Sequence, residues 1–156
     1  MASIRIDKKF KTTLENLSPD KTDKKCFENY AHLASFAAGL AFLKGNKKKY
    51  PLKNNPENTE IRDVVLDQDV YKQQIDMLVM AHEESHKIIE ETEENKLKKY
   101  NIFQDYVNNG LSIFEKIKSK NPNDESGIDT VIQILEETSS DYVIKGDESE
   151  FGDTKF

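Results

Sequence analysis

The chain has 156 residues and a mass of 18.0 kDa, which suits one domain with a single core. Apolar residues make up 36% of it and charged residues 33%, and the formal net charge is −6. This acidic balance excludes a protein that coats nucleic acid with its whole surface.

The first half of the chain predicts two helices. Residues 3–6 are β-branched enough for a short strand, and Asp7 then caps a helix to about Leu17. Asp23 follows as the cap of a second helix over residues 24–43, whose small apolar residues recur at helical spacing. Glycine, proline and asparagine then predict a loop over residues 44–60.

The second half predicts further helices separated by short connections. Residues 61–66 suggest an extended segment, followed by a helix that starts near residue 67 or 69 and runs to about 91. We expect its inward side chains to be Val70, Tyr71, Gln74, Met77, Leu78 and Ala81. A fourth helix runs to about residue 119, with Asn108, Asn109 and Gly110 as a point of weakness that kinks or breaks it. A short helix is predicted over 128–135.

These elements predict a mainly α fold, with four to five helices and one or two short extended segments. We expect a helical core domain over residues 1–120, a linker and short helix over 121–138, and an acidic, disordered tail over 139–156.

The charges are divided unevenly along the chain. Residues 1–53 contain 12 Lys/Arg against 5 Asp/Glu, and residues 54–156 contain 11 against 24. A balance of +7 followed by −13 predicts a dipolar surface and therefore a binding partner.

The cellular compartment is predicted from three features that we do not find in the sequence. Cys26 is the only cysteine, so no internal disulfide is expected. The start of the sequence shows no apolar segment typical of a signal peptide, and the apolar run at 31–43 is shorter than the roughly 20 residues of a membrane span. We expect a cytoplasmic protein without a membrane contact.

His82, Glu83 and His86 spell H-E-x-x-H, the pattern of many zinc proteases. On one helix the two histidines would share a face, and Glu83 would act as general base on a zinc-bound water. Against this, Glu84 puts a charge inside the pattern, and the remaining histidine, His32, lies on another predicted helix. We favour a core-facing helix without catalytic residues or cofactor, and keep a zinc-dependent hydrolase as an alternative.

Two other groups of residues suggest chemistry. Cys26 and His32 could form a nucleophile and base, but on one helix their spacing puts them on opposite sides. The lysine loop is the more informative group, because its lysines could contact a phosphate backbone and its tyrosine could stack on a base. It consists of Lys44, Lys47, Lys48, Lys49, Tyr50 and Lys53. The alternative is a solvated loop without a ligand.

Three segments resemble those of one protein family, in the order that the family uses. They are FAAGLAFLKGNKKKYPLK (36–53), TEIRDVVLDQD (59–69) and FQDYVNNGLSIFEKI (103–117). Small accessory proteins of DNA phosphorothioation (Dnd) loci contain similar stretches over what would be residues 3–118. Asn109 stands where the family tends to have glycine, and the tail after about residue 120 is interpreted as an addition.

The resemblance implies a role in bacterial antiviral defence, beside machinery that modifies or cleaves DNA, and it supplies no catalytic residues. We therefore favour a non-enzymatic accessory or adaptor subunit that binds a larger protein of a defence complex, and DNA through the lysine loop. The zinc hydrolase is one alternative. A regulatory protein whose acidic half mimics DNA is another.

Overall fold

The computed structural model describes residues 2–19 and 25–146, with side chains up to residue 139. Its elements are β1 (Ser3–Ile6), η1 (Lys8–Phe10), α1 (Lys11–Leu17), α2 (Tyr30–Leu43), β2 (Thr59–Arg62), α3 (Asp63–Leu66), α4 (Asp69–Glu83), η2 (His86–Ile89), α5 (Glu93–Ser119) and α6 (Ile128–Gly146). The prediction of a mainly α fold is confirmed, with six α-helices in the described ranges and one two-stranded sheet. None of the helices in these ranges is long and apolar enough to span a bilayer.

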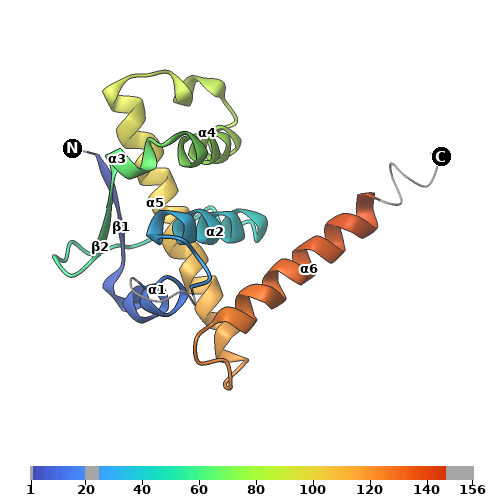
Figure 1. Ribbon diagram of the computed structural model, residues 1–156. Coiled ribbons are helices and arrows are strands. Elements are labelled where there is room, and N and C mark those ends of the chain that lie inside the picture. Colours follow the sequence, from blue (N-terminus) through green and yellow to red (C-terminus); the bar gives the residue numbers. More distant parts are fainter. Residues whose placement is uncertain (1, 20–24, 147–156) are drawn as a thin grey trace.

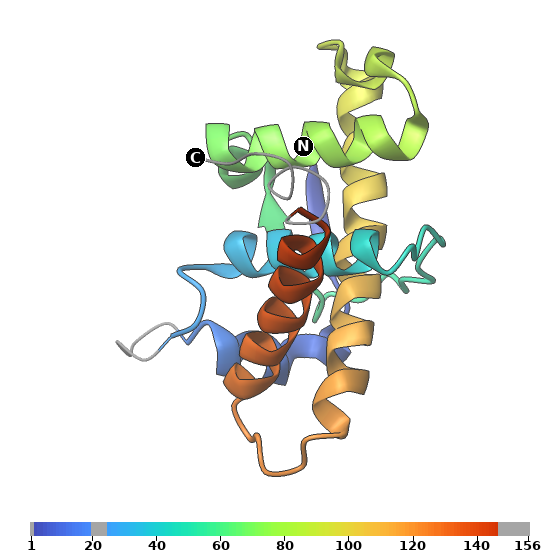
Figure 2. The same cartoon turned by 90° about the vertical axis from the view of Figure 1, so that its right-hand side faces the viewer.

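Helix α5 is the centre of the molecule, and α2 crosses it (Figures 1 and 2). With 27 residues, α5 is about 40 Å long. The buried face of α2 consists of alanines, whose small side chains let the two helices approach closely. They are Ala31, Ala34, Ala37, Ala38 and Ala41. At the crossing, a Cβ on Gly110 would lie 1.7 Å from the carbonyl oxygen of Ala37. The two backbones are therefore in direct contact.

The predicted weakness at Asn108, Asn109 and Gly110 is wrong, since α5 is continuous through them. All three residues are buried, and both asparagine side chains have hydrogen-bond partners. Asn108 accepts from the backbone N–H of Asp7 at 2.8 Å and donates to the carbonyl of Arg5 at 2.9 Å. The three residues that suggested a break thus form contacts between α5 and the elements packed against it.

The sheet is small and lies against α5. β1 and β2 are antiparallel, with Ser3 opposite Arg62 and Ile6 opposite Thr59. Ile4 and Ile6 are fully buried. The backbone N–H of Arg5 donates to Gln104 at 2.8 Å, so α5 satisfies polar groups of β1 that do not bond to β2.

Two predicted elements have different boundaries. The helix predicted from residue 24 begins at Tyr30, because the Asn29 side chain caps it by accepting from the N–H of His32 at 2.9 Å. Asp23, the predicted cap, lies outside the described residues. The segment predicted as extended at 61–66 is a strand only to Arg62, and the single turn of α3 follows.

The helix predicted to run to about residue 91 ends at Glu83. Glu84 has a φ of 53°, in the left-handed region, and closes α4 before the separate turn of η2. The face of α4 also differs from the predicted one. Its buried residues are Tyr71, Ile75 and Val79, whereas Val70 and Met77 are exposed.

The last helix is longer than predicted. α6 continues to Gly146 and so enters the segment 139–156 that we expected to be disordered; residues 147–156 lie outside the described ranges. In Figure 1, α6 leaves the base of the molecule and points away from the other helices.

The close helix crossing predicts that one added methyl group at residue 110 destabilises the protein. Gly110→Ala places a Cβ against the backbone of Ala37, which cannot move as a flexible side chain would, and we expect a loss of about 3 kcal/mol in the free energy of unfolding. Urea denaturation measures it.

Gly39→Ala is the matched control. A Cβ on Gly39 meets nothing within 4 Å, so the helix preference of alanine should stabilise the protein by up to about 1 kcal/mol. Equal stability of the two variants would contradict the close crossing.

Candidate functional site

The H-E-x-x-H residues are not on one helix. His82 lies in the last turn of α4, the left-handed Glu84 follows, and His86 belongs to η2. The Nδ1 atom of His82 lies 2.7 Å from the hydroxyl of Tyr106. Glu83 forms an ion pair with Lys98 at 3.2 Å. Of the residues that the zinc hydrolase alternative requires, His82 and Glu83 lie on the predicted helix, but His86 does not share it.

No metal site is formed by these residues and their neighbours. Within residues 2–19 and 25–139, no three His, Cys, Asp or Glu side chains are grouped so that they could hold an ion. His32, the third histidine, packs against the ring of Phe27 with centroids 5.3 Å apart. The predicted alternative of a zinc centre therefore gains no third ligand in this part of the chain.

Cys26 and His32 do not have the relation that one helix would impose. Cys26 precedes α2, and both residues line the same apolar groove. Burial raises the pKa of the Cys26 thiol, so the thiol is protonated at neutral pH. The pair therefore has no activated nucleophile.

In the lysine loop, the lysines and the tyrosine have different roles. Lys44, Lys47, Lys48, Lys49 and Lys53 are exposed. Tyr50 is only 8% exposed and donates from its hydroxyl to Asp7 at 2.7 Å. Burial, followed by the contact with Asp7, raises the pKa of Tyr50. Its ring is an internal anchor and is not available to stack on a base.

Helix α5 holds the loop in place. Asn109 donates from its side chain to the carbonyl of Lys48 at 2.7 Å. Asp105 accepts from the backbone N–H of Tyr50 at 3.1 Å. Burial raises the pKa of Asp105, although the hydrogen bond from Tyr50 and the charge of Lys49 act in the opposite direction. The lysines are therefore presented by a backbone with defined contacts.

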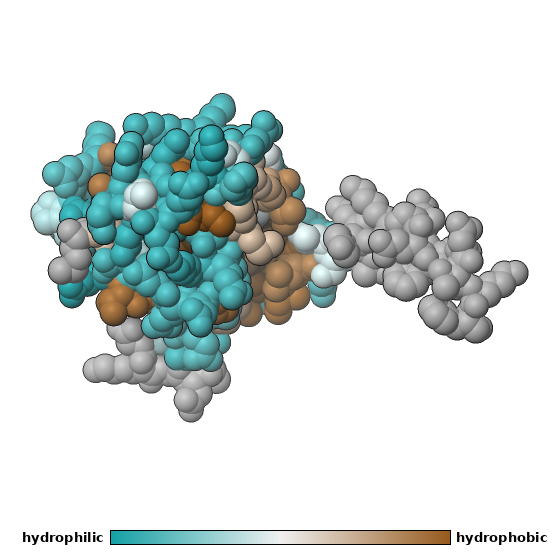
Figure 3. Space-filling model, turned by 90° about the horizontal axis from the view of Figure 1, so that it is seen from above, coloured by the Kyte–Doolittle hydropathy of each residue, from teal (hydrophilic) through white to brown (hydrophobic). Residues whose placement is uncertain are grey.

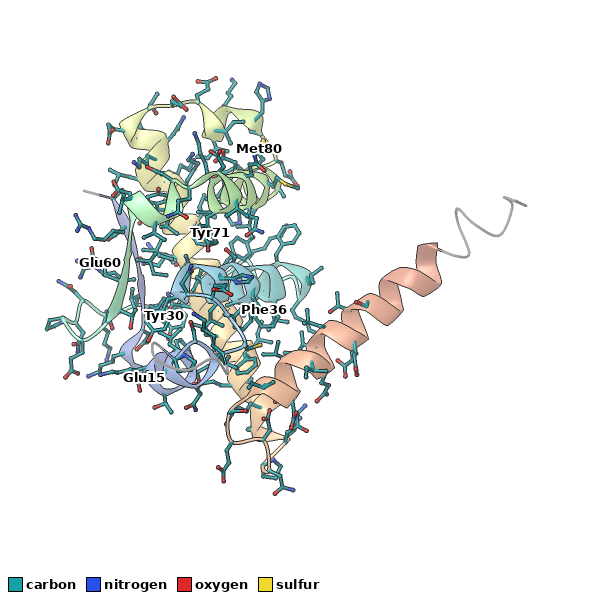
Figure 4. All side chains as sticks on the ribbon, in the orientation of Figure 1. Glu15, Tyr30, Phe36, Glu60, Tyr71 and Met80 are labelled. Atoms are coloured by element: carbon teal, nitrogen blue, oxygen red, sulfur yellow. The ribbon has the colours of Figure 1, made fainter. Side chains whose placement is uncertain are left out.

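An apolar groove lies between α2, α4 and the start of α6. Its volume is about 770 Å³. Phe42, Met77 and Leu135 are 41%, 67% and 51% exposed. Figure 3 shows hydrophobic side chains gathered beside the base of α6, and Figure 4 shows Phe36 on the side of α2 that faces α6. The groove is lined by Cys26, Phe27, His32, Ser35, Phe36, Ala38, Gly39, Phe42, Gln74, Met77, Leu78, Ala81, Phe103, Val131 and Leu135.

The sequence does not predict this groove. The signal was present in Phe36 and Phe42, which are large apolar residues in a helix whose alanines already supply a core face, whereas Met77 was predicted to face the core. Periodicity alone does not separate a side chain in the core from one in a surface groove.

The wall that α6 contributes depends on the buried Asp124. Its carboxylate accepts from the backbone N–H of Gly127 at 3.0 Å and from the N–H and hydroxyl of Thr130 at 2.8 and 2.6 Å. Burial alone would raise the pKa of Asp124, but the hydrogen bonds from Thr130 and the backbone outweigh it and lower the pKa. The ionised carboxylate thus fixes the first turn of α6.

A second, charged hollow of about 470 Å³ lies between α4 and the start of α5. Its three lysines are all paired with carboxylates. Lys99 contacts Asp76 at 2.9 Å, Lys96 contacts Asp67 at 3.0 Å and Lys72 contacts Glu91 at 3.2 Å. The first two pairs connect α5 to α4 and to the residue after α3, and the third connects α4 to the segment before α5, so we assign the hollow a structural role.

Comparison with known proteins gives a match to a protein family. A family model described as DNA sulphur modification system-associated protein 4 matches residues 3–155. The resemblance to Dnd-associated accessory proteins is thereby confirmed. The match also extends beyond residue 120, so the interpretation of the tail as an addition to the family pattern is wrong. No curated protein and no solved structure matches the chain.

Asp124 predicts how the start of α6 responds to pH. Its folded-state pKa is below the ordinary value of 3.8, so its stabilisation is present above that value and is lost as the pH falls through the lowered one. We expect Asp124→Asn to lose about 2 kcal/mol of unfolding free energy at neutral pH and much less once the pH is below the lowered pKa of Asp124. Urea denaturation at both pH values tests this.

Asp129→Asn is the control, since Asp129 is exposed in the first turn of α6, close in the sequence to Asp124. Its effect should stay within about 0.5 kcal/mol at both pH values. A loss for Asp124→Asn that does not depend on pH would show that the charge of Asp124 is not responsible.

Proposed function

Because the chain belongs to the family of DNA sulphur modification system-associated protein 4, we propose that it is a non-enzymatic accessory subunit of that system. It binds a larger protein of the system and, with it, takes part in bacterial defence against phage. The groove between α2, α4 and α6 is the surface that makes this contact.

The open apolar groove is the observation that supports this proposal best. Phe42, Met77 and Leu135 leave large parts of their surfaces in water, although burial of such a side chain is worth about 1.5–3 kcal/mol. The three side chains come from three different helices and line one hollow. Exposed apolar surface concentrated in this way is typical of a protein-binding site.

The apolar lining of the groove suits an amphipathic helix of the partner. The lining residues come mainly from α2, α4 and α6. A helix with apolar residues at positions i, i+3, i+4 and i+7 would bury them there. Among the described residues, no Asp, Glu, Lys or Arg side chain lines the groove, so the contact is expected to depend on apolar burial more than on ion pairs.

The non-enzymatic part of the proposal is supported by the state of the candidate catalytic groups. His82 is engaged by Tyr106, Glu83 by Lys98, and the Cys26 thiol is protonated. A nucleophile with an adjacent base is not found among them.

The proposed contact is tested by a charge placed in the groove. Met77→Glu puts a carboxylate on the exposed wall contributed by α4, where binding would bury it without a partner. We expect at least about tenfold weaker retention of the other proteins of the system when they are co-expressed with the tagged variant.

Val70→Glu is the matched control, because Val70 is 57% exposed on the same helix and does not line the groove. It should bind as the unchanged protein does. Equal retention by all three proteins would contradict the proposal. A homodimer in light scattering that Met77→Glu dissociates would assign the groove to a second copy of the chain, and would also contradict it.

A further inference from the structure

We propose that the lysine loop and the N-terminal strand together form a surface that binds the phosphate backbone of duplex DNA. This basic surface consists of Arg5, Lys8, Lys9, Lys47, Lys48, Lys49 and Lys53. It is separate from the groove, since no residue of the loop lines the groove. The inference therefore does not depend on the protein contact proposed above.

The fold brings two basic segments together that are about 40 residues apart in the sequence. The side chain of Arg5 donates to Asn54 at 3.4 Å, and the backbone N–H of Lys8 donates to Asn58 at 3.0 Å. The ammonium group of Lys9 lies 5.4 Å from the ring centroid of Tyr50. Asn54 and Asn58, which follow the lysines of the loop, thus lie beside β1 and η1.

Both segments are held by the same helix. Gln104 and Asn108 of α5 bind the backbone of Arg5 and Asp7, while Asp105 and Asn109 bind the loop at Tyr50 and Lys48. A surface that is fixed before binding loses less conformational entropy when a ligand arrives. The exposed lysines are therefore held on an ordered backbone before a ligand binds. A solvated loop without a ligand would not require these hydrogen bonds.

The charges of this surface are positive in sum. Its seven basic side chains face the acidic side chains of Asp7, Glu57, Glu60 and Asp105. Asp7 and Asp105 accept hydrogen bonds from Tyr50. Within the described part of the chain, Lys8 is the one member of this surface in an ion pair, with Glu57 at 3.6 Å. Among the described residues, Lys47, Lys48, Lys49 and Lys53 take part in no ion pair. These four ammonium groups are free to exchange counterions for phosphates.

The chemistry of the surface favours the backbone of duplex DNA. The aromatic rings that Lys9 contacts, Phe10 and Tyr50, are both buried, so they offer no platform on which an unpaired base could stack. The loop contains neither a helix nor a strand before β2 that could enter the major groove. Binding should therefore be independent of base sequence and strongly dependent on salt.

The experiment measures fluorescence anisotropy of a labelled duplex from about 50 to about 200 mM salt. With four to five phosphates contacted, the logarithm of the binding constant should fall with the logarithm of salt concentration with a slope of about −4. The triple variant Lys47→Gln, Lys48→Gln, Lys49→Gln should bind at least about tenfold more weakly and lower the slope by about 3. Lys9→Gln should lower it by about 1, which tests the contribution of the N-terminal segment.

The triple variant Lys116→Gln, Lys118→Gln, Lys120→Gln is the control, because it removes the same charge at the far end of α5. It and Met77→Glu should bind DNA within about twofold of the unchanged protein. The inference is overturned if the duplex is not retained at low salt, or if both triple variants weaken binding equally. Tighter binding of single-stranded DNA or of RNA than of the duplex would also overturn it.

Discussion

The close crossing of α2 over α5 at Gly110 is the constraint on which the structure depends. Only a residue without a Cβ leaves room there for the carbonyl of Ala37. Next to Gly110 on α5, Asn108 binds β1 and Asn109 binds the lysine loop. The helix crossing and the anchoring of the strand and the loop thus use three consecutive residues of α5.

The two proposed binding surfaces share this frame but no residues. The groove uses the side of α2 that carries Phe36 and Phe42, together with α4 and α6. The basic surface is built on the polar side chains of α5 and on β1. An accessory subunit arranged in this way could contact a larger protein and the DNA on which the system acts at the same time.

Several elements could be predicted because a local pattern decides them. The alanines of α2 are buried as their helical spacing indicated. The predictions failed where a tertiary contact overrides local preference. Asn108, Asn109 and Gly110 resemble a helix breaker, yet their partners keep α5 continuous. Glu84 resembles a helical residue, yet its left-handed conformation ends α4 and separates His82 from His86.

The sequence by itself determined the helical class of the fold, the family and the exposed lysines, because these follow from periodicity, from short segments and from charge. Only the tertiary structure decided what the side chains contact. In the folded protein Tyr50 is buried, Cys26 lies before the helix that contains His32, and a groove is formed between helices that are far apart in the chain. Burial and proximity arise from packing between distant segments, and a pattern within one segment carries no information about its neighbour.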